Sequence, residues 1–160
     1  MMNKQGLDHQ IVEKLKLKCS KPKLNDWKRV TKLESEQKGE TKIAMVGKYT
    51  ELVDSYKSVN EALIHAGIHN KTNVKIEHID SERFNKGVEN LEADGILIPG
   101  GFGNRGVKGM LNVAKFAREN NIPYFGICLG MQVAVIEFAR NVLKLDADST
   151  EFKKNTQHPV

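Results

Sequence analysis

Short apolar segments alternate with longer segments of helical periodicity through most of this chain, and that alternation determines the class of fold. Strands alternating with helices are typical of an α/β protein built around a parallel sheet. One segment, "GILIP" (95–99), is continuously apolar, which favours burial on both faces of such a sheet. The predicted strands are 42–46, 74–79, 95–99 and 124–127, and the predicted helices are 53–67, 107–121 and 129–143.

A cysteine lies where a predicted strand meets a predicted helix, in "PYFGICLGMQ" (123–132). Cys128 has Gly126 two residues before it and Gly130 two residues after it, which is the nucleophile-elbow pattern with Cys in place of Ser. So sharp a turn strains the backbone of the nucleophile, and side chains at the two glycine positions would collide with neighbouring elements. The alternative is a small buried hydrophobic residue, since free cysteine is often that.

The same turn predicts an oxyanion site. The N–H of Leu129 is expected to point at the space above the sulfur. A second donor is expected from "PGGFG" (99–103), a loop of bare backbone in which Gly100 and Gly101 follow the preceding strand. The overlapping "GFGNRG" (101–106) matches a dinucleotide fingerprint, but it follows the third predicted strand rather than the first. A tight turn without a ligand role is the other interpretation.

A cysteine nucleophile needs a base, and the histidines do not supply a convincing one. Two of them fall on or just after the first predicted helix, where surface positions are expected, and His78 lies within a predicted strand. His158 follows the elbow but stands close to the last residue. The histidines of the chain are His9, His65, His69, His78 and His158.

Charge and composition exclude several classes of protein. Residues 1–42 hold 11 Lys/Arg against 6 Asp/Glu, whereas residues 43–160 hold 14 of each, so the net charge of +5 belongs to the leader. That distribution argues against a nucleic-acid-binding face. Cys19 and Cys128 show no disulfide or zinc-ligand spacing. No apolar run approaches the roughly 20 residues that cross a bilayer, and no signal-peptide core is visible, so a cytoplasmic protein without membrane contact is expected.

Several motifs together resemble the glutaminase domain of the CTP synthase family, which belongs to the class I glutamine amidotransferases. The opening "QGLDHQIVEKLKLKCSKPKLNDWKRV" resembles the end of that family's synthetase domain and its linker, so the implied domains are residues 1–40 and 41–160. The matching segments are "GKYTELVDSYKSVNEAL" (47–63), "PGGFGNRG" (99–106), "PYFGICLGMQ" (123–132), "EFARNV" (137–142), "STEF" (149–152) and the terminal T-x-x-P-V (156–160).

The resemblance implies a fold and a chemistry. The fold would be flavodoxin-like, with three layers and a mostly parallel sheet, incomplete at its C-terminus. Cys128 would attack the side-chain amide of L-glutamine, form a thioester and release ammonia, with no metal involved. The positions that the resemblance assigns to the oxyanion or to substrate binding are Gly101, Leu129, Gly130, Met131, Gln132 and Glu151.

The resemblance also implies what lies outside these residues. The family's catalytic His and Glu come from a segment beyond residue 160, so the chain alone is expected to be a fragment with little or no glutaminase turnover. ATP, Mg and UTP, which the family uses to make CTP, belong to a synthetase domain, and the full-length family is expected to form homo-oligomers. A cysteine-elbow hydrolase of the peptidase or deglycase type and a non-catalytic regulatory module remain as alternatives.

Overall fold

The computed structural model describes residues 3–49 and 54–160 of the chain. These residues form two compact units, of which the first ends at Ser35 and the second is Glu36–Val160. The first unit contains a short 3-10 helix η1 (Asn3–Gln5) and the helices α1 (Leu7–Lys14) and α2 (Asn25–Ser35). Neither α1 nor α2 is among the predicted helices, because the resemblance implies a domain tail and linker for residues 1–40. No residue of α2 is buried and its Trp27 is 70% exposed, although its apolar residues recur at helical spacing.

The second unit is built around a parallel sheet, as the alternation predicts. Its strands are β1 (Glu40–Gly47), β2 (Asn73–Asp80), β3 (Gly95–Ile98) and β4 (Tyr124–Gly126). Their order across the sheet is β2-β1-β3-β4, and every neighbouring pair is parallel. The reversal of strand order between β1 and β3 is the switch point at which open α/β sheets bind ligands.

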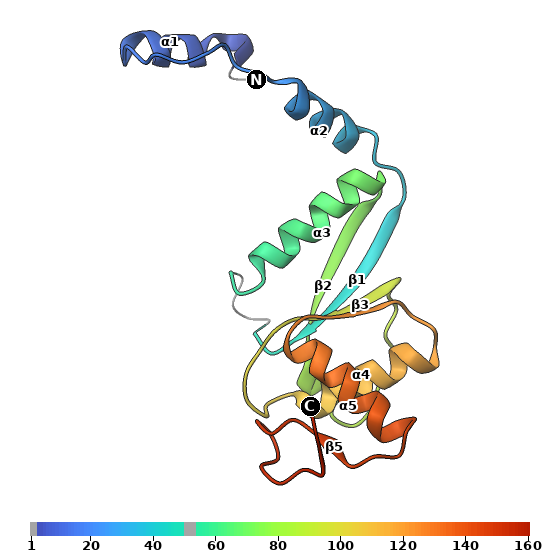
Figure 1. Ribbon diagram of the computed structural model, residues 1–160. Helices are drawn as coiled ribbons and strands as arrows, with labels where there is room; N and C mark the ends of the chain where they lie inside the picture. The colour runs from blue at the N-terminus through green and yellow to red at the C-terminus, as the bar shows by residue number, and fades with distance from the viewer. Residues whose placement is uncertain (1–2, 50–53) are drawn as a thin grey trace. The chain divides into compact units, whose positions relative to one another are not determined.

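Helices connect these strands (Figure 1). After α3 (Lys57–Asn70) and the short η2 (Ser81–Phe84) come α4 (Val107–Glu119) and α5 (Leu129–Asn141). The strands β5 (Ala147–Asp148) and β6 (His158–Pro159), which were not expected, form a separate parallel pair. The prediction of 53–67 for α3 ends too early, because Lys71 in the left-handed conformation, rather than Gly67, terminates the helix.

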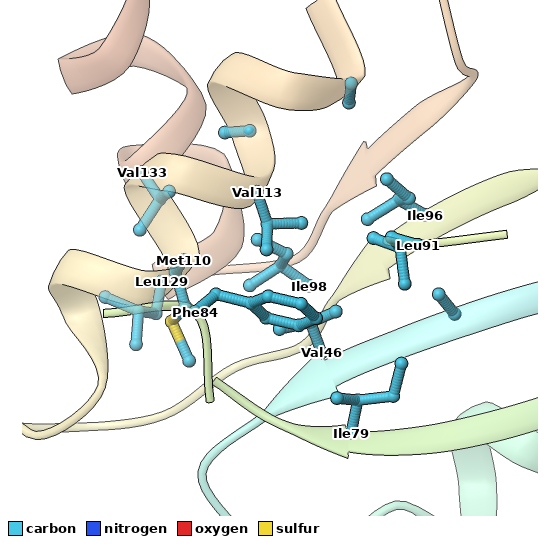
Figure 2. Packing of buried hydrophobic residues seen from close by; sticks show 13 residues of the cluster. Val46, Ile79, Phe84, Leu91, Ile96, Ile98, Met110, Val113, Leu129 and Val133 are labelled. Atoms are coloured by element: carbon cyan, nitrogen blue, oxygen red, sulfur yellow. The ribbon is translucent and has the colours of Figure 1, made fainter. Parts of the chain in front are cut away.

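Successive strand residues face opposite sides of the sheet, which gives three layers. On one side Val46 and Ile98 pack with residues of α4 and α5 such as Val113 and Leu129, and Figure 2 shows these side chains gathered there with the ring of Phe84. On the other side, Met45 and Leu97 pack with Tyr56 at the start of α3 and with Val59 and Leu63 within it. The α/β flavodoxin-like fold expected from the sequence is thus confirmed.

One expectation about α5 was wrong. Its composition predicts a largely buried helix, but only one side of it faces the core, through residues such as Val133 and Ile136. The other side carries apolar side chains that are 42–57% exposed, because nothing in the described part of the chain covers them. The exposed stripe consists of Met131, Val135, Phe138 and Val142.

Strand β4 lies at an edge of the sheet. Within residues 3–49 and 54–160 it pairs only with β3, and the side chain of Phe125 on it is 62% exposed. An apolar residue on an open strand edge favours association with further chain or with another molecule.

Candidate active site

The carboxyl ends of β1, β3 and β4 bring three chain segments to one edge of the sheet. Lys48 follows β1, Gly100 and Gly101 follow β3 after Pro99, and Cys128 follows β4 after Ile127. Because these strands are neighbours in the sheet, the segments after them are neighbours as well. Ligands of open α/β sheets bind at this edge.

The turn at Cys128 has the geometry that the elbow pattern predicts. Cys128 adopts φ 53° and ψ −107°, a conformation that is costly for a residue with a side chain, and it precedes α5 directly. A Cβ atom at Gly126 would lie 2.3 Å from the carbonyl carbon of Gly130, and one at Gly130 would lie 2.0 Å from the carbonyl oxygen of Ile98. Cys128 is exposed, so it is not a buried core residue.

The glycine loop lies against this elbow. A Cβ atom at Gly100 would be 3.5 Å from the Cβ of Cys128, and one at Gly101 would be 3.3 Å from a methyl carbon of Leu129. Gly103 has φ +74°, which other residues rarely adopt. Bare backbone of Gly100 and Gly101 therefore sits beside the thiol and beside Leu129, the other candidate oxyanion residue.

Two charged side chains contact the backbone of the loop. The Nζ of Lys48 donates to the carbonyl oxygen of Phe102 at 2.9 Å and also to that of Gly103. Glu151 accepts from the N–H of Gly103 at 2.6 Å. Burial lowers the pKa of Lys48, while the nearby carboxylate of Glu151 acts in the opposite direction. Sequence reasoning assigned no role to Lys48; its only signal is a lysine placed directly after an apolar strand.

The side chain of Gln132 has an oxygen atom without a hydrogen-bond donor among the described residues. Its backbone N–H donates to the carbonyl of Cys128 at 3.2 Å, which places it in the first turn of α5. Its side-chain oxygen is buried and has no hydrogen-bond partner in the described part of the chain. Buried amide oxygens are rarely left unpaired, so Gln132 stands out among the polar residues of α5.

The remaining candidates, Gly130 and Met131, play different parts in the structure. The carbonyl oxygen of Gly130 accepts from the hydroxyl of Tyr124 at 2.7 Å, and the residue packs tightly beneath β3. Burial raises the pKa of that Tyr124 hydroxyl well above its ordinary value, so the group stays a hydrogen-bond donor. Met131 is 57% exposed, at the start of the exposed stripe of α5.

The described histidines lie away from Cys128 in the hydrogen-bond network. His78 lies on β2 and bonds Asn60 of α3 at 3.2 Å. Two strands separate β2 from β4, a distance of about 14 Å at the usual strand spacing. His158 is exposed on β6. No described histidine makes a hydrogen bond to Cys128.

Two kinds of feature are absent from residues 3–49 and 54–160. No group of His, Cys, Asp and Glu there is arranged to hold a metal ion. None of the helices described is long and apolar enough to span a membrane.

Comparison with known proteins identifies the family of this chain. Residues 51–159 match the glutamine amidotransferase class-I family. A solved structure, described as the Trypanosoma brucei CTPS glutaminase domain with bound acivicin, is 46% identical with a TM-score of 0.66. The match covers 75% of this chain and 48% of that chain, so this chain spans about half the length of that relative. The chain belongs to the class I glutamine amidotransferases and is similar, within them, to the glutaminase domain of CTP synthase.

Proposed function

We propose that this chain is part of the glutamine-hydrolysing domain of a CTP synthase, with Cys128 as the nucleophile. The observation that carries the proposal is the exposed Cys128 in a strained elbow beside the glycine loop, where a Cβ atom added at Gly100 would lie 3.5 Å from the Cβ of Cys128. Strained, exposed nucleophiles at a strand-to-helix turn are typical of acyl-transfer enzymes. The family match and the CTP synthase neighbour support glutamine as the acyl donor.

The proposed reaction has two steps. The sulfur of Cys128 bonds to the side-chain carbonyl carbon of L-glutamine, and the carbon–nitrogen bond breaks as a proton passes to the leaving ammonia. Water then cleaves the thioester and gives glutamate. The N–H groups of Gly101 and Leu129 are proposed to donate to the oxyanion, as the contact between these two residues allows.

Substrate recognition is proposed to involve side chains around the elbow. The unpartnered oxygen of Gln132 accepts a hydrogen bond from the substrate, and Met131 lines the exposed side of the site. Glu151 adds negative charge beside the glycine loop, where the α-ammonium of an amino acid is favoured. Gly130 serves the site by allowing the close approach of α5 to β3.

The general base is proposed to lie outside these 160 residues. No described histidine bonds the thiol of Cys128, and the triad logic requires a base to take its proton. Loss of one member of a catalytic triad removes most of the rate. We therefore infer that the chain alone turns glutamine over slowly, while its Cys128 stays available to electrophiles.

The wider proposal follows the CTP synthase neighbour. Ammonia from this domain would pass to a synthetase domain that aminates UTP at the expense of ATP with Mg, in a cytoplasmic homo-oligomer. The residues before β1 would then be the end of the synthetase domain and the linker. The 46% identity to a CTPS glutaminase domain supports this assignment.

Alkylation of Cys128 by iodoacetamide, followed by mass mapping, tests the proposed function. L-glutamine at ten times its dissociation constant should slow the reaction about 10-fold, because the occupied site excludes the reagent. D-glutamine should not slow it, and the exposed Cys19 should react at the same rate throughout. Equal rates with and without L-glutamine would favour a non-catalytic module of the same fold.

A further inference from the structure

Lys48 is a buried cation whose partners are main-chain atoms. The residue is only 3% exposed, at the carboxyl end of β1. Removing an ammonium group from water is costly unless hydrogen bonds replace its hydration. The carbonyls of Phe102 and Gly103 supply those bonds. A lysine in this position therefore stabilises one particular arrangement of the glycine loop.

Within residues 3–49 and 54–160, Lys48 and Glu151 are the residues whose side chains hydrogen-bond the loop backbone. Positions 100, 101 and 103 carry no side chain, and the side chain of Phe102 is 77% exposed. Its placement therefore depends on contacts to its backbone, which come from Lys48 on the carbonyl side and from Glu151 on the N–H side. Glycine-rich backbone without such contacts would sample many conformations.

The stem of the same lysine reaches the candidate oxyanion residue. A Cβ atom at Gly101 would lie 3.4 Å from the Cδ of Lys48 and 3.3 Å from Leu129, so Gly101 sits between the lysine stem and the elbow. We propose that Lys48 is a positioning residue that holds the glycine loop so that the N–H of Gly101 faces the oxyanion. This inference rests on the glutaminase function proposed above.

The backbone of Lys48 is itself held in place. The hydroxyl of Tyr56, just before α3, accepts from the N–H groups of Lys48 and Tyr49, both at 3.2 Å. Arg105, which follows the glycine loop, donates to the carbonyl oxygen of Lys48. Tyr56 is 5% exposed and packs against Met45 and Leu97. The ammonium is thus presented from a rigid end of β1.

Hydrogen exchange measures the loop without any glutamine chemistry. In the full 160-residue chain, Lys48→Met should make the amides of residues 100–103 exchange at least about 10-fold faster, because their backbone anchor is lost. Tyr56→Phe, which keeps the buried ring, should change the same amides in the same direction by a smaller factor. Lys42→Met, at an exposed lysine of the same strand, should leave them unchanged. Unchanged exchange in Lys48→Met and Tyr56→Phe would overturn the inference.

Two reagents then separate positioning from simple loss of structure. The diazoketone 6-diazo-5-oxo-L-norleucine is a glutamine analogue whose carbonyl would occupy the oxyanion site, whereas iodoacetamide reports access to the thiol alone. Lys48→Met should slow diazoketone labelling of Cys128 roughly 10- to 100-fold and change the iodoacetamide rate by less than about twofold. Equal slowing of both reagents would refute positioning.

The two proposals fail in different ways. If the unaltered chain shows no preference for the diazoketone at Cys128, the glutaminase proposal fails, and the exchange measurement still decides whether Lys48 holds the loop. If the unaltered chain is labelled and Lys48→Met is labelled equally fast, only the inference about Lys48 fails. The Lys42→Met variant should match the unaltered chain in each measurement.

Discussion

Replacing Gly130 with alanine should destabilise the second unit by about 3 kcal/mol or more and abolish selective labelling of Cys128. The added Cβ would lie 2.0 Å from the carbonyl oxygen of Ile98 and 2.8 Å from its carbonyl carbon. Both are backbone atoms of a fully buried strand residue, and that oxygen accepts the N–H of Ile127 at 2.9 Å. Neither α5 nor β3 can withdraw without breaking this bond and opening the core.

Thermal unfolding followed by circular dichroism measures this effect. For a unit of this size the destabilisation corresponds to a fall in Tm of about 10 °C. The control is Gly39→Ala, where φ is +76° but no atom lies within 4 Å of the added Cβ, so only backbone strain of about 1 kcal/mol is expected. Equal melting temperatures for Gly130→Ala and the unaltered chain would show that α5 does not pack on β3 as described.

The buried ion pair between α4 and α5 predicts an asymmetric response to substitution. The side chain of Glu137 is only 3% exposed. Its carboxylate accepts hydrogen bonds from the guanidinium of Arg118 at 2.8 Å and from the side-chain amide of Asn141 at 3.0 Å. Hydrogen bonds to Glu137 raise the pKa of Arg118, so the cation is firmly charged. A carboxylate of Glu137 left buried without its cation costs about 3 kcal/mol. Arg118→Met should therefore be strongly destabilising.

The opposite substitution should be milder, because it leaves a different group behind. In Glu137→Gln the guanidinium of Arg118, whose side chain is 33% exposed, can turn toward water, and the amide keeps a hydrogen bond. The double variant Arg118→Met/Glu137→Leu should recover most of the loss, since no charge stays buried.

Urea unfolding of the three variants gives the order of their free energies of unfolding. Lys115→Met, from a surface pair with Glu119 at 3.9 Å, is the control and should change stability by less than about 1 kcal/mol. A larger loss in Glu137→Gln than in Arg118→Met would contradict this account.

Much of the architecture was predictable because the sheet is buried. The strand at 95–99 can be predicted from its unbroken run of apolar residues. The strand-to-helix turn at Cys128 can be predicted from Gly126 and Gly130, where a side chain would collide with neighbouring backbone. The helix at residues 25–35 was missed although Trp27, Val30 and Leu33 recur at helical spacing, because the basic, polar composition around them is equally typical of a linker. The burial of α5 was overestimated because composition cannot say whether both sides of an apolar helix have a neighbour.

The site was predictable to a lesser extent. Local pattern suggests Cys128, Leu129 and the glycine loop as candidates, since the turn and the loop each occupy a few consecutive residues, and the family resemblance singles out Gly101. Lys48, which contacts the loop across more than fifty positions of sequence, could not be found that way. The hydrogen-bond partners of Lys48 are backbone carbonyls, which every residue has, so the residue types around Lys48 and in the glycine loop do not reveal the contact. Contacts of this kind become visible only when the strand order is known.

Labelling with 6-diazo-5-oxo-L-norleucine, followed by mass mapping of the modified peptide, is the decisive test of Cys128 as a nucleophile toward glutamine. A single modified residue, Cys128, is expected, with Cys19 untouched although both thiols are exposed. L-glutamine should protect the site, and Cys128→Ser should leave the chain unmodified. Modification of Cys19 as fast as Cys128, or no protection by L-glutamine, would contradict the claim that this elbow presents a nucleophile to an amide side chain.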